Sequence, residues 1–97
     1  MIAVHPRTAK HLVLSRLAAA PAPLSVLLQR VRARQEAAGA PVKMSAELLR
    51  RHLKTLAKHG YAKEAEDDAF SLTPLGELTL IGLGEWQPRY RPLEASA

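Results

Sequence analysis

The chain has 97 residues, of which 47% are hydrophobic and only 4% aromatic, and its net charge is +5. This length allows one domain with a modest core, and a core so poor in aromatics favours helices over a β-sandwich. The absence of cysteine excludes disulfides and thiolate metal sites. The longest apolar run, residues 17–28, contains two prolines and is too short to cross a bilayer, and the N-terminus lacks a signal-peptide pattern. We therefore expect a soluble, cytoplasmic protein.

Charge is distributed unevenly along the chain. Residues 1–63 hold twelve Lys and Arg against two acids, whereas residues 64–97 hold two Arg against seven acids. Such asymmetry predicts a strongly cationic surface and a polyanionic partner, most often nucleic acid. The alternative is that the charge serves only solubility, and charge by itself favours neither.

The first predicted helix begins at Pro6 or Thr8 and ends near Ala19, with apolar residues at helical spacing. Pro21 and Pro23 then interrupt the helical pattern, because proline lacks an N–H donor and disfavours helix in the residue before it.

The second predicted helix begins at a Ser25 cap and ends near Ala37, and Arg30 and Arg34 project together from one of its sides. Gly39 is a typical helix stop. The connector of about six residues that follows is longer than the turn of a compact helix-turn-helix.

The third helix carries the clearest pattern. Ser45 is its predicted cap, Met44 is placed to pack on Leu49 as a hydrophobic staple, and Gly60 is its predicted left-handed stop. Successive turns of 100° place the leucines of this segment on one side. The other side carries Glu47, Arg51, Lys54 and Lys58, with Arg50 on the flank. The segment is therefore an amphipathic helix with a cationic outer face.

A hairpin and a short last helix follow. Residues 61–63 and 69–72 are predicted strands around an acidic turn, residues 64–68, in which four of five residues are acids. Thr73 and Pro74 form a predicted cap and first helical position. The last helix ends near Gly82 or Gly84, which predicts a domain over residues 1–84 and an extended tail over residues 85–97.

This order of elements resembles the winged helix-turn-helix fold. Residues 45–61 are similar to the recognition helix of MarR- and PadR-like regulators, in which a helix ending in glycine and an apolar residue leads into the wing. Residues 70–76, Phe-Ser-Leu-Thr-Pro-Leu-Gly, are similar to the junction that closes the wing. The resemblance implies a mainly α fold with a small β-hairpin: a three-helix core, a two-stranded wing and a short C-terminal helix.

The resemblance also implies a function. The third helix would enter the major groove of double-stranded DNA, as in a sequence-specific transcriptional regulator that forms a homodimer through its first and last helices. An arginine paired with guanine contributes about 1–3 kcal/mol of discrimination. The implied DNA-binding residues are Ser45, Glu47, Arg50, Arg51, Lys54 and Lys58 of the third helix region, with Arg30, Arg34 and Lys43 adding phosphate contacts. The alternative for the cations of the third helix is an ordinary solvated face.

The acidic turn does not fit a wing that touches DNA, because its charges would be repelled by phosphates. An alternative function is therefore a winged-helix adaptor that binds a protein and not DNA. A third hypothesis is a DNA-end or replication-associated domain without operator preference. The surfaces available to a protein partner are the acids Glu64, Glu66, Asp67 and Asp68 and the tail residues Trp86, Arg89, Tyr90 and Arg91; Trp86 has the alternative of packing on its own domain.

Enzymatic chemistry is not predicted. The four histidines (His5, His11, His52 and His59) have no cysteine or carboxylate cluster beside them, whereas a metal site needs three or four convergent ligands. No nucleophile motif or phosphate-binding glycine loop is visible. We expect no cofactor, no metal and no ligand pocket.

Overall fold

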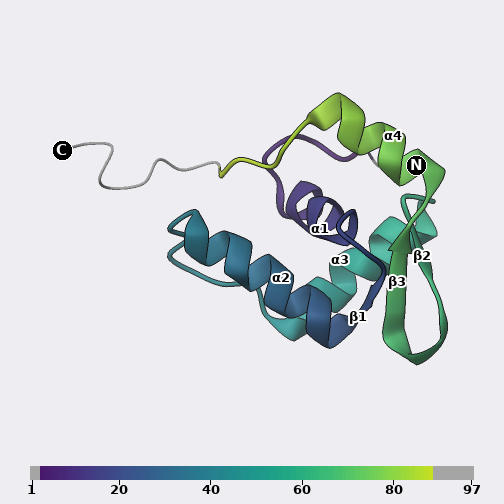
Figure 1. Cartoon of the computed structure of the whole chain (residues 1–97), viewed down its shortest axis with the longest axis horizontal. Coiled ribbons are helices and arrows are strands. Elements are labelled where there is room, and N and C mark those ends of the chain that lie inside the picture. The colour runs from purple at the N-terminus through teal and green to yellow at the C-terminus, as the bar shows by residue number, and fades with distance from the viewer. Residues whose placement is uncertain (1–2, 89–97) are drawn as a thin grey trace.

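The computed structural model describes residues 3–88, which form four α-helices and a small antiparallel sheet (Figure 1). The prediction of a mainly helical domain with a β-hairpin is confirmed. Within this range no helix combines the length and the apolar character needed to cross a membrane. The helices are α1 (Ala9–Leu17), α2 (Leu24–Ala37), α3 (Ala46–Lys58) and α4 (Pro74–Leu83), and the strands are β1 (Ala22–Pro23), β2 (Ala62–Glu64) and β3 (Ala69–Leu72).

Helix α1 is the centre of the core. It contacts the other three helices and β3, and Figure 1 shows it enclosed among them. Its cap is Thr8, whose side chain accepts a hydrogen bond from the backbone N–H of His11. The helix ends at Leu17, before the predicted Ala19. Five of its nine residues are buried: His11, Leu12, Val13, Leu14 and Leu17.

The buried His11 has partners for both ring nitrogens. Its Nδ1 accepts from the backbone N–H of Arg7 at 3.1 Å, and its Nε2 lies 3.0 Å from the carbonyl oxygen of Gly84. A buried polar group is tolerated when its hydrogen bonds are satisfied. His11 therefore joins the N-terminal segment to the end of α4.

The start of α2 differs from the prediction. The residue before the helix is Pro23, which makes no side-chain cap, and Ser25 lies exposed inside the first turn. The reason is tertiary, because Ala22 and Pro23 form the strand β1 and pair with Phe70 and Ala69 of β3. The sheet therefore has three strands in the order β1-β3-β2, and its third strand was not predicted.

The connector between α2 and α3, residues 38–45, is held by side chains of α2. The Nε of Arg32 donates to the carbonyl oxygen of Met44 at 2.9 Å, and the Oε1 of Gln35 accepts from the N–H of Met44 at 2.8 Å. Gly39 has a φ of +76°, in the left-handed region. These contacts set where α3 begins, although the connector is longer than a compact turn.

The observed boundaries of α3 confirm the predicted cap and stop. The side chain of Ser45 accepts from the N–H of Leu48, and Gly60 has a φ of +86°. Leu49, Leu53 and Leu56 are fully buried. The hairpin follows directly, with Glu64 of β2 opposite Phe70 of β3. The outer face of α3 is thus left to polar residues.

The junction between β3 and α4 explains the motif of residues 70–76. The hydroxyl of Thr73 donates to the carbonyl oxygen of Gly60 and accepts from the N–H of Gly76 at 3.1 Å. Pro74 occupies the first turn of α4. Gly76 is buried, and a Cβ there would collide with the carbonyl oxygen of Tyr61 and the side chain of Leu72.

Gly76→Ala is therefore expected to lower the free energy of unfolding by about 1–3 kcal/mol, as overpacking does in a tight core. The matched control is Gly82→Ala in the same helix, where a Cβ meets nothing within 4 Å. That substitution should raise stability by roughly 0.5–1 kcal/mol, because alanine is the better helix former. Urea unfolding of both variants checks the pair, and equal effects would contradict the close approach at Gly76.

Trp86 packs on its own domain, so the first residues of the predicted tail belong to the folded unit. Its side chain is buried, and its Nε1 donates to the carbonyl oxygen of Thr8 at 3.2 Å. The guanidinium of Arg34 lies 5.2 Å from the indole centroid and donates to the carbonyl oxygen of Trp86. The other residues named for the tail, Arg89, Tyr90 and Arg91, lie outside the described range.

Candidate nucleic-acid interface

Within residues 3–88, two exposed cations of α3 have no ionic partner on another element. The side chain of Arg51 is 70% exposed, and it forms an ion pair, 3.6 Å long, with the carboxylate of Glu47 one turn earlier, which is also exposed. Lys58 is exposed and forms neither a hydrogen bond nor an ion pair within residues 3–88. Exposed pairs on one helix are weak because water and salt screen them. Both side chains are therefore accessible to a large anionic ligand.

Arg50 lies on the flank of α3 beside the hairpin and is paired. Its two terminal nitrogens donate to the two carboxylate oxygens of Asp68 at 3.1 and 3.0 Å. This hydrogen bonding lowers the pKa of Asp68 below its ordinary value and raises the pKa of Arg50. The geometry is the bidentate one that guanidinium also uses for phosphate.

Lys54 is paired on the same flank. Its Nζ lies 2.7 Å from both carboxylate oxygens of Glu64, the last residue of β2. We call the contacts Arg50–Asp68 and Lys54–Glu64 the hairpin ion pairs. They join the acidic turn to α3 and pair two of its cations, although the side chains of Arg50 and Lys54 remain 45% and 50% exposed.

The backbone of the acidic turn explains this placement. Residues Glu66–Asp68 form a single 3₁₀ turn in which Asp67 and Asp68 have φ angles of 60° and 57°. Aspartate tolerates this left-handed region better than most residues. Glu66 and Asp67 are exposed and form no ion pair within the described part of the chain. The turn thus directs two acids toward α3 and two toward solvent.

Arg30 and Arg34 do not lie with the cations of α3. Arg30 donates to the carbonyl oxygen of Ala20 at 2.7 Å, just beyond the end of α1, and Arg34 is engaged by Trp86. The hollow that both arginines line takes residues from α1, α2 and the segment after α1, and none from α3. The unpaired carbonyls at a helix C-terminus attract cations. The resemblance implied phosphate contacts for both arginines beside the cations of α3, whereas in the structure they lie between α1 and α2.

Lys43 is also occupied by its own chain. Its Nζ lies 2.9 Å from the carboxylate of Glu36 and donates to the carbonyl oxygen of Ala40 at 2.8 Å. It sits on the connector before α3. Its contacts stabilise the connector and leave it less available to phosphate than Arg51 or Lys58.

No group of three or more side chains suited to a metal ion comes together within residues 3–88. In this part of the chain the ionisable groups of the site are arranged as pairs of opposite charge, as the single exposed cation Lys58, or as the single exposed acids Glu66 and Asp67.

Comparison with known proteins leaves the family of this chain open. No family model, no curated protein and no solved structure matches it. Its function must be inferred from the residues themselves.

Proposed function

We propose that this chain is a winged helix-turn-helix domain that binds double-stranded DNA through α3, as a small sequence-specific transcriptional regulator. The observation that carries the proposal is the accessible cationic face of α3, where Arg51 and Lys58 stand in solvent on a capped helix. A helix of 13 residues is about 20 Å long, and the major groove admits a rod of this width.

The proposed contacts divide by position. Arg51, near the middle of α3, is the residue suited to pair bidentately with guanine, while Ser45 and Glu47 lie at the N-terminal end that meets base edges. Lys58 would contact phosphate. Arg50 and Lys54 contact DNA only when they exchange the carboxylates of the hairpin for phosphates. Arg30, Arg34 and Lys43 are left out of the proposed contacts, because each binds its own chain.

The hairpin is not proposed as a DNA contact. Its turn exposes the acids Glu66 and Asp67, which phosphates repel. We propose instead that the hairpin ion pairs occupy Arg50 and Lys54 in the free protein and compete with phosphates for them.

A homodimer is part of the proposal. Leu78 and Ile81 of α4 are 67% and 78% exposed, and α4 lies at the outer edge of the molecule in Figure 1. Ile81 also lines a hollow of about 410 Å³. The other lining residues are Leu80 and the acid Glu77 of α4, Ser71 and Leu72 of β3, and Leu17, Ala18, Ala20 and Pro21 at and after the end of α1. Because the rest of α1 is mostly buried, the proposed interface uses α4 and only the C-terminal end of α1. A two-fold dimer suits a two-fold DNA site.

Ile81→Glu is expected to convert the dimer into a monomer without loss of stability, because the side chain is exposed within the protomer. The matched control is Val42→Glu on the connector, since Val42 is also 78% exposed. Sedimentation equilibrium of the three proteins measures the effect. A wild-type chain that is monomeric at high concentration would rule out this interface.

The proposed function is tested by fluorescence anisotropy with a random-sequence duplex over a range of salt concentrations. The logarithm of the binding constant should fall linearly with the logarithm of salt, by about 0.9 for each phosphate neutralised. Selection from a random pool should then enrich one sequence. Binding without enrichment would favour the DNA-end hypothesis.

Absence of binding at low salt would overturn the DNA-binding proposal and favour the adaptor alternative. One observation supports that alternative: the hairpin ion pairs already neutralise two cations of α3. Under either function we propose no catalysis and no cofactor, and under the regulator function a cytoplasmic location beside DNA.

A further inference from the structure

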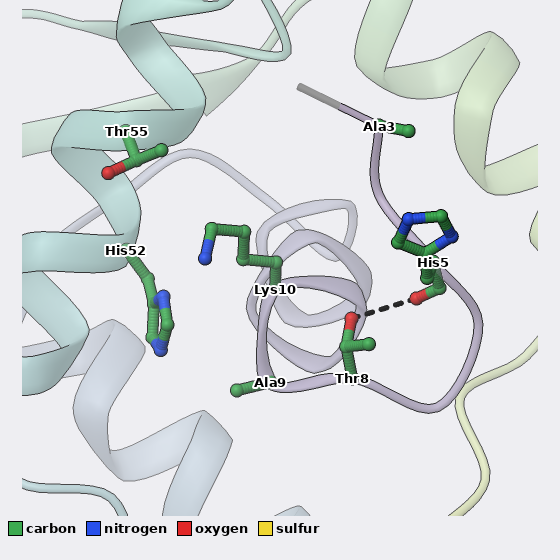
Figure 2. Close-up of a pocket in the computed structure, with 7 residues that line it drawn as sticks. All are labelled: Ala3, His5, Thr8, Ala9, Lys10, His52 and Thr55. Atoms are coloured by element: carbon green, nitrogen blue, oxygen red, sulfur yellow. Dashed lines mark hydrogen bonds between the residues drawn. The ribbon is translucent and has the colours of Figure 1, made fainter.

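A hollow whose surface is mostly apolar lies on the other flank of α3, away from the hairpin. Its volume is about 330 Å³, and its polar lining consists of His5, Thr8, Lys10, His52 and Thr55. Figure 2 shows Lys10 extending from α1 toward α3, with its ammonium group on the side of His52 and Thr55, and His5 on the opposite side. The lining includes no acid.

The charges around this hollow are uncompensated. The ammonium of Lys10 forms no hydrogen bond or ion pair within residues 3–88, so its three N–H donors are available. The hollow also opens at the N-terminal end of α1, where the helix dipole is positive. The pKa of His52 is lowered, first by burial and then by the positive charges of Lys10 in α1 and Arg51 in α3. An anion that binds beside Lys10 would offset the effect of its charge and raise the pKa of His52.

The hollow borders the exposed face of α3. The hydroxyl of Thr55 donates to the carbonyl oxygen of Arg51 at 3.0 Å, so the side chain of Thr55 lies one turn along the helix from Arg51. A duplex that receives α3 in its major groove places a phosphate backbone along each flank of the helix. One flank carries the acidic turn, and the other carries this cationic hollow.

We propose that this hollow is a phosphate-binding site, in which Lys10 and His52 hold a backbone phosphate of the duplex bound to α3. That the phosphate belongs to a DNA duplex rests on the proposed function. A free tetrahedral oxyanion offers the same chemistry, and the experiment separates the two sources.

Lys10→Gln is expected to weaken duplex binding about tenfold at low salt, as the loss of one charged hydrogen bond does. It should also reduce the slope of the salt dependence by about 0.9, the value for one phosphate. The matched control is Arg16→Gln on the same helix, because Arg16 lines the hollow between α1 and α2 instead. The control should retain wild-type affinity and slope.

A second readout is the pKa of the His52 imidazole, followed by NMR in the wild type and in the Lys10→Gln variant. The charged groups that lower the pKa of His52 are Lys10 and Arg51, and the side chain of His5 lines the hollow on its other side. The pKa should rise when a duplex is added, and the rise should be smaller in the variant. Inorganic sulfate, compared with chloride at equal ionic strength, is the probe for a free oxyanion.

The outcomes are distinct. If the duplex binds but Lys10→Gln changes neither affinity nor slope and the pKa of His52 does not move, this inference is overturned and the proposed function stands. If no duplex binds, the proposed function fails, and the sulfate titration then tests whether the hollow binds a free oxyanion. A rise in the pKa of His52 with sulfate then supports a free oxyanion as the ligand, and no rise overturns the site.

Discussion

Replacing Arg51 with alanine should weaken binding to the selected duplex by about 1–3 kcal/mol and relax the preference at one base pair, as the loss of a bidentate guanine contact does. Adding Lys58→Ala should weaken binding to all sequences alike and lower the salt slope by about 0.9. The physical reason is that both side chains stand in solvent on the outer face of α3. Anisotropy titrations with selected and random duplexes measure both effects.

The control for these variants is Lys63→Gln, which removes an exposed cation from β2 and should leave binding unchanged. Folding should also be unaffected, because the pair between Arg51 and Glu47 is exposed and screened. Thermal unfolding verifies this. If the Arg51 and Lys58 variants bind as tightly as the wild type, α3 is not the DNA-reading element.

Removing the hairpin ion pairs should strengthen DNA binding. The double substitution Glu64→Gln and Asp68→Asn leaves Arg50 and Lys54 without carboxylate partners, so two more cations of α3 become available to phosphates. The affinity for a random duplex should rise, and the salt slope should steepen by up to about 1.8, the value for two further phosphates. The same anisotropy titration reports both quantities.

The matched control is Glu66→Gln with Asp67→Asn, which removes the same charge from the same turn without breaking an ion pair. Asparagine tolerates the left-handed backbone of Asp67. If both double variants raise affinity equally, the gain is one of net charge, and the hairpin ion pairs do not compete with DNA.

Acidification is a poorer way to release these cations. The pKa of Asp68 in the folded protein lies below its ordinary value. The stability that the pair contributes is therefore fully present when the pH is above the ordinary pKa of aspartate, and it is lost only when the pH falls through the lowered pKa of the folded state. At neutral pH the pair with Arg50 is therefore intact, and substitution is the cleaner test.

Local patterns predicted the parts of this protein whose causes lie within a few residues. The cap at Ser45 depends on an N–H three residues away, and Gly60 ends α3 through its own backbone conformation. The same holds for Thr73, which caps α4. Helical spacing also predicted that Arg51 and Lys58 face outward, because the leucines of α3 determine which side is buried.

Local patterns left open or missed the features that depend on distant pairing; for Trp86, packing on its own domain was one of two alternatives. Strand β1 consists of Ala22 and Pro23, which carry no strand pattern and become a strand only because β3 presents its edge to them. Trp86 lies in the predicted tail, but in the structure its Nε1 donates to the carbonyl oxygen of Thr8 and its ring contacts the guanidinium of Arg34.

What the sequence determined by itself is an amphipathic, capped, cationic helix followed by an acidic hairpin turn. Only the tertiary structure decided which cations stay accessible. Arg50 and Asp68 are 18 residues apart, and Lys54 and Glu64 are 10 apart, so their pairing requires the hairpin to fold back along α3. Helical spacing sets the direction of a side chain, whereas its ionic partner depends on which elements pack beside it.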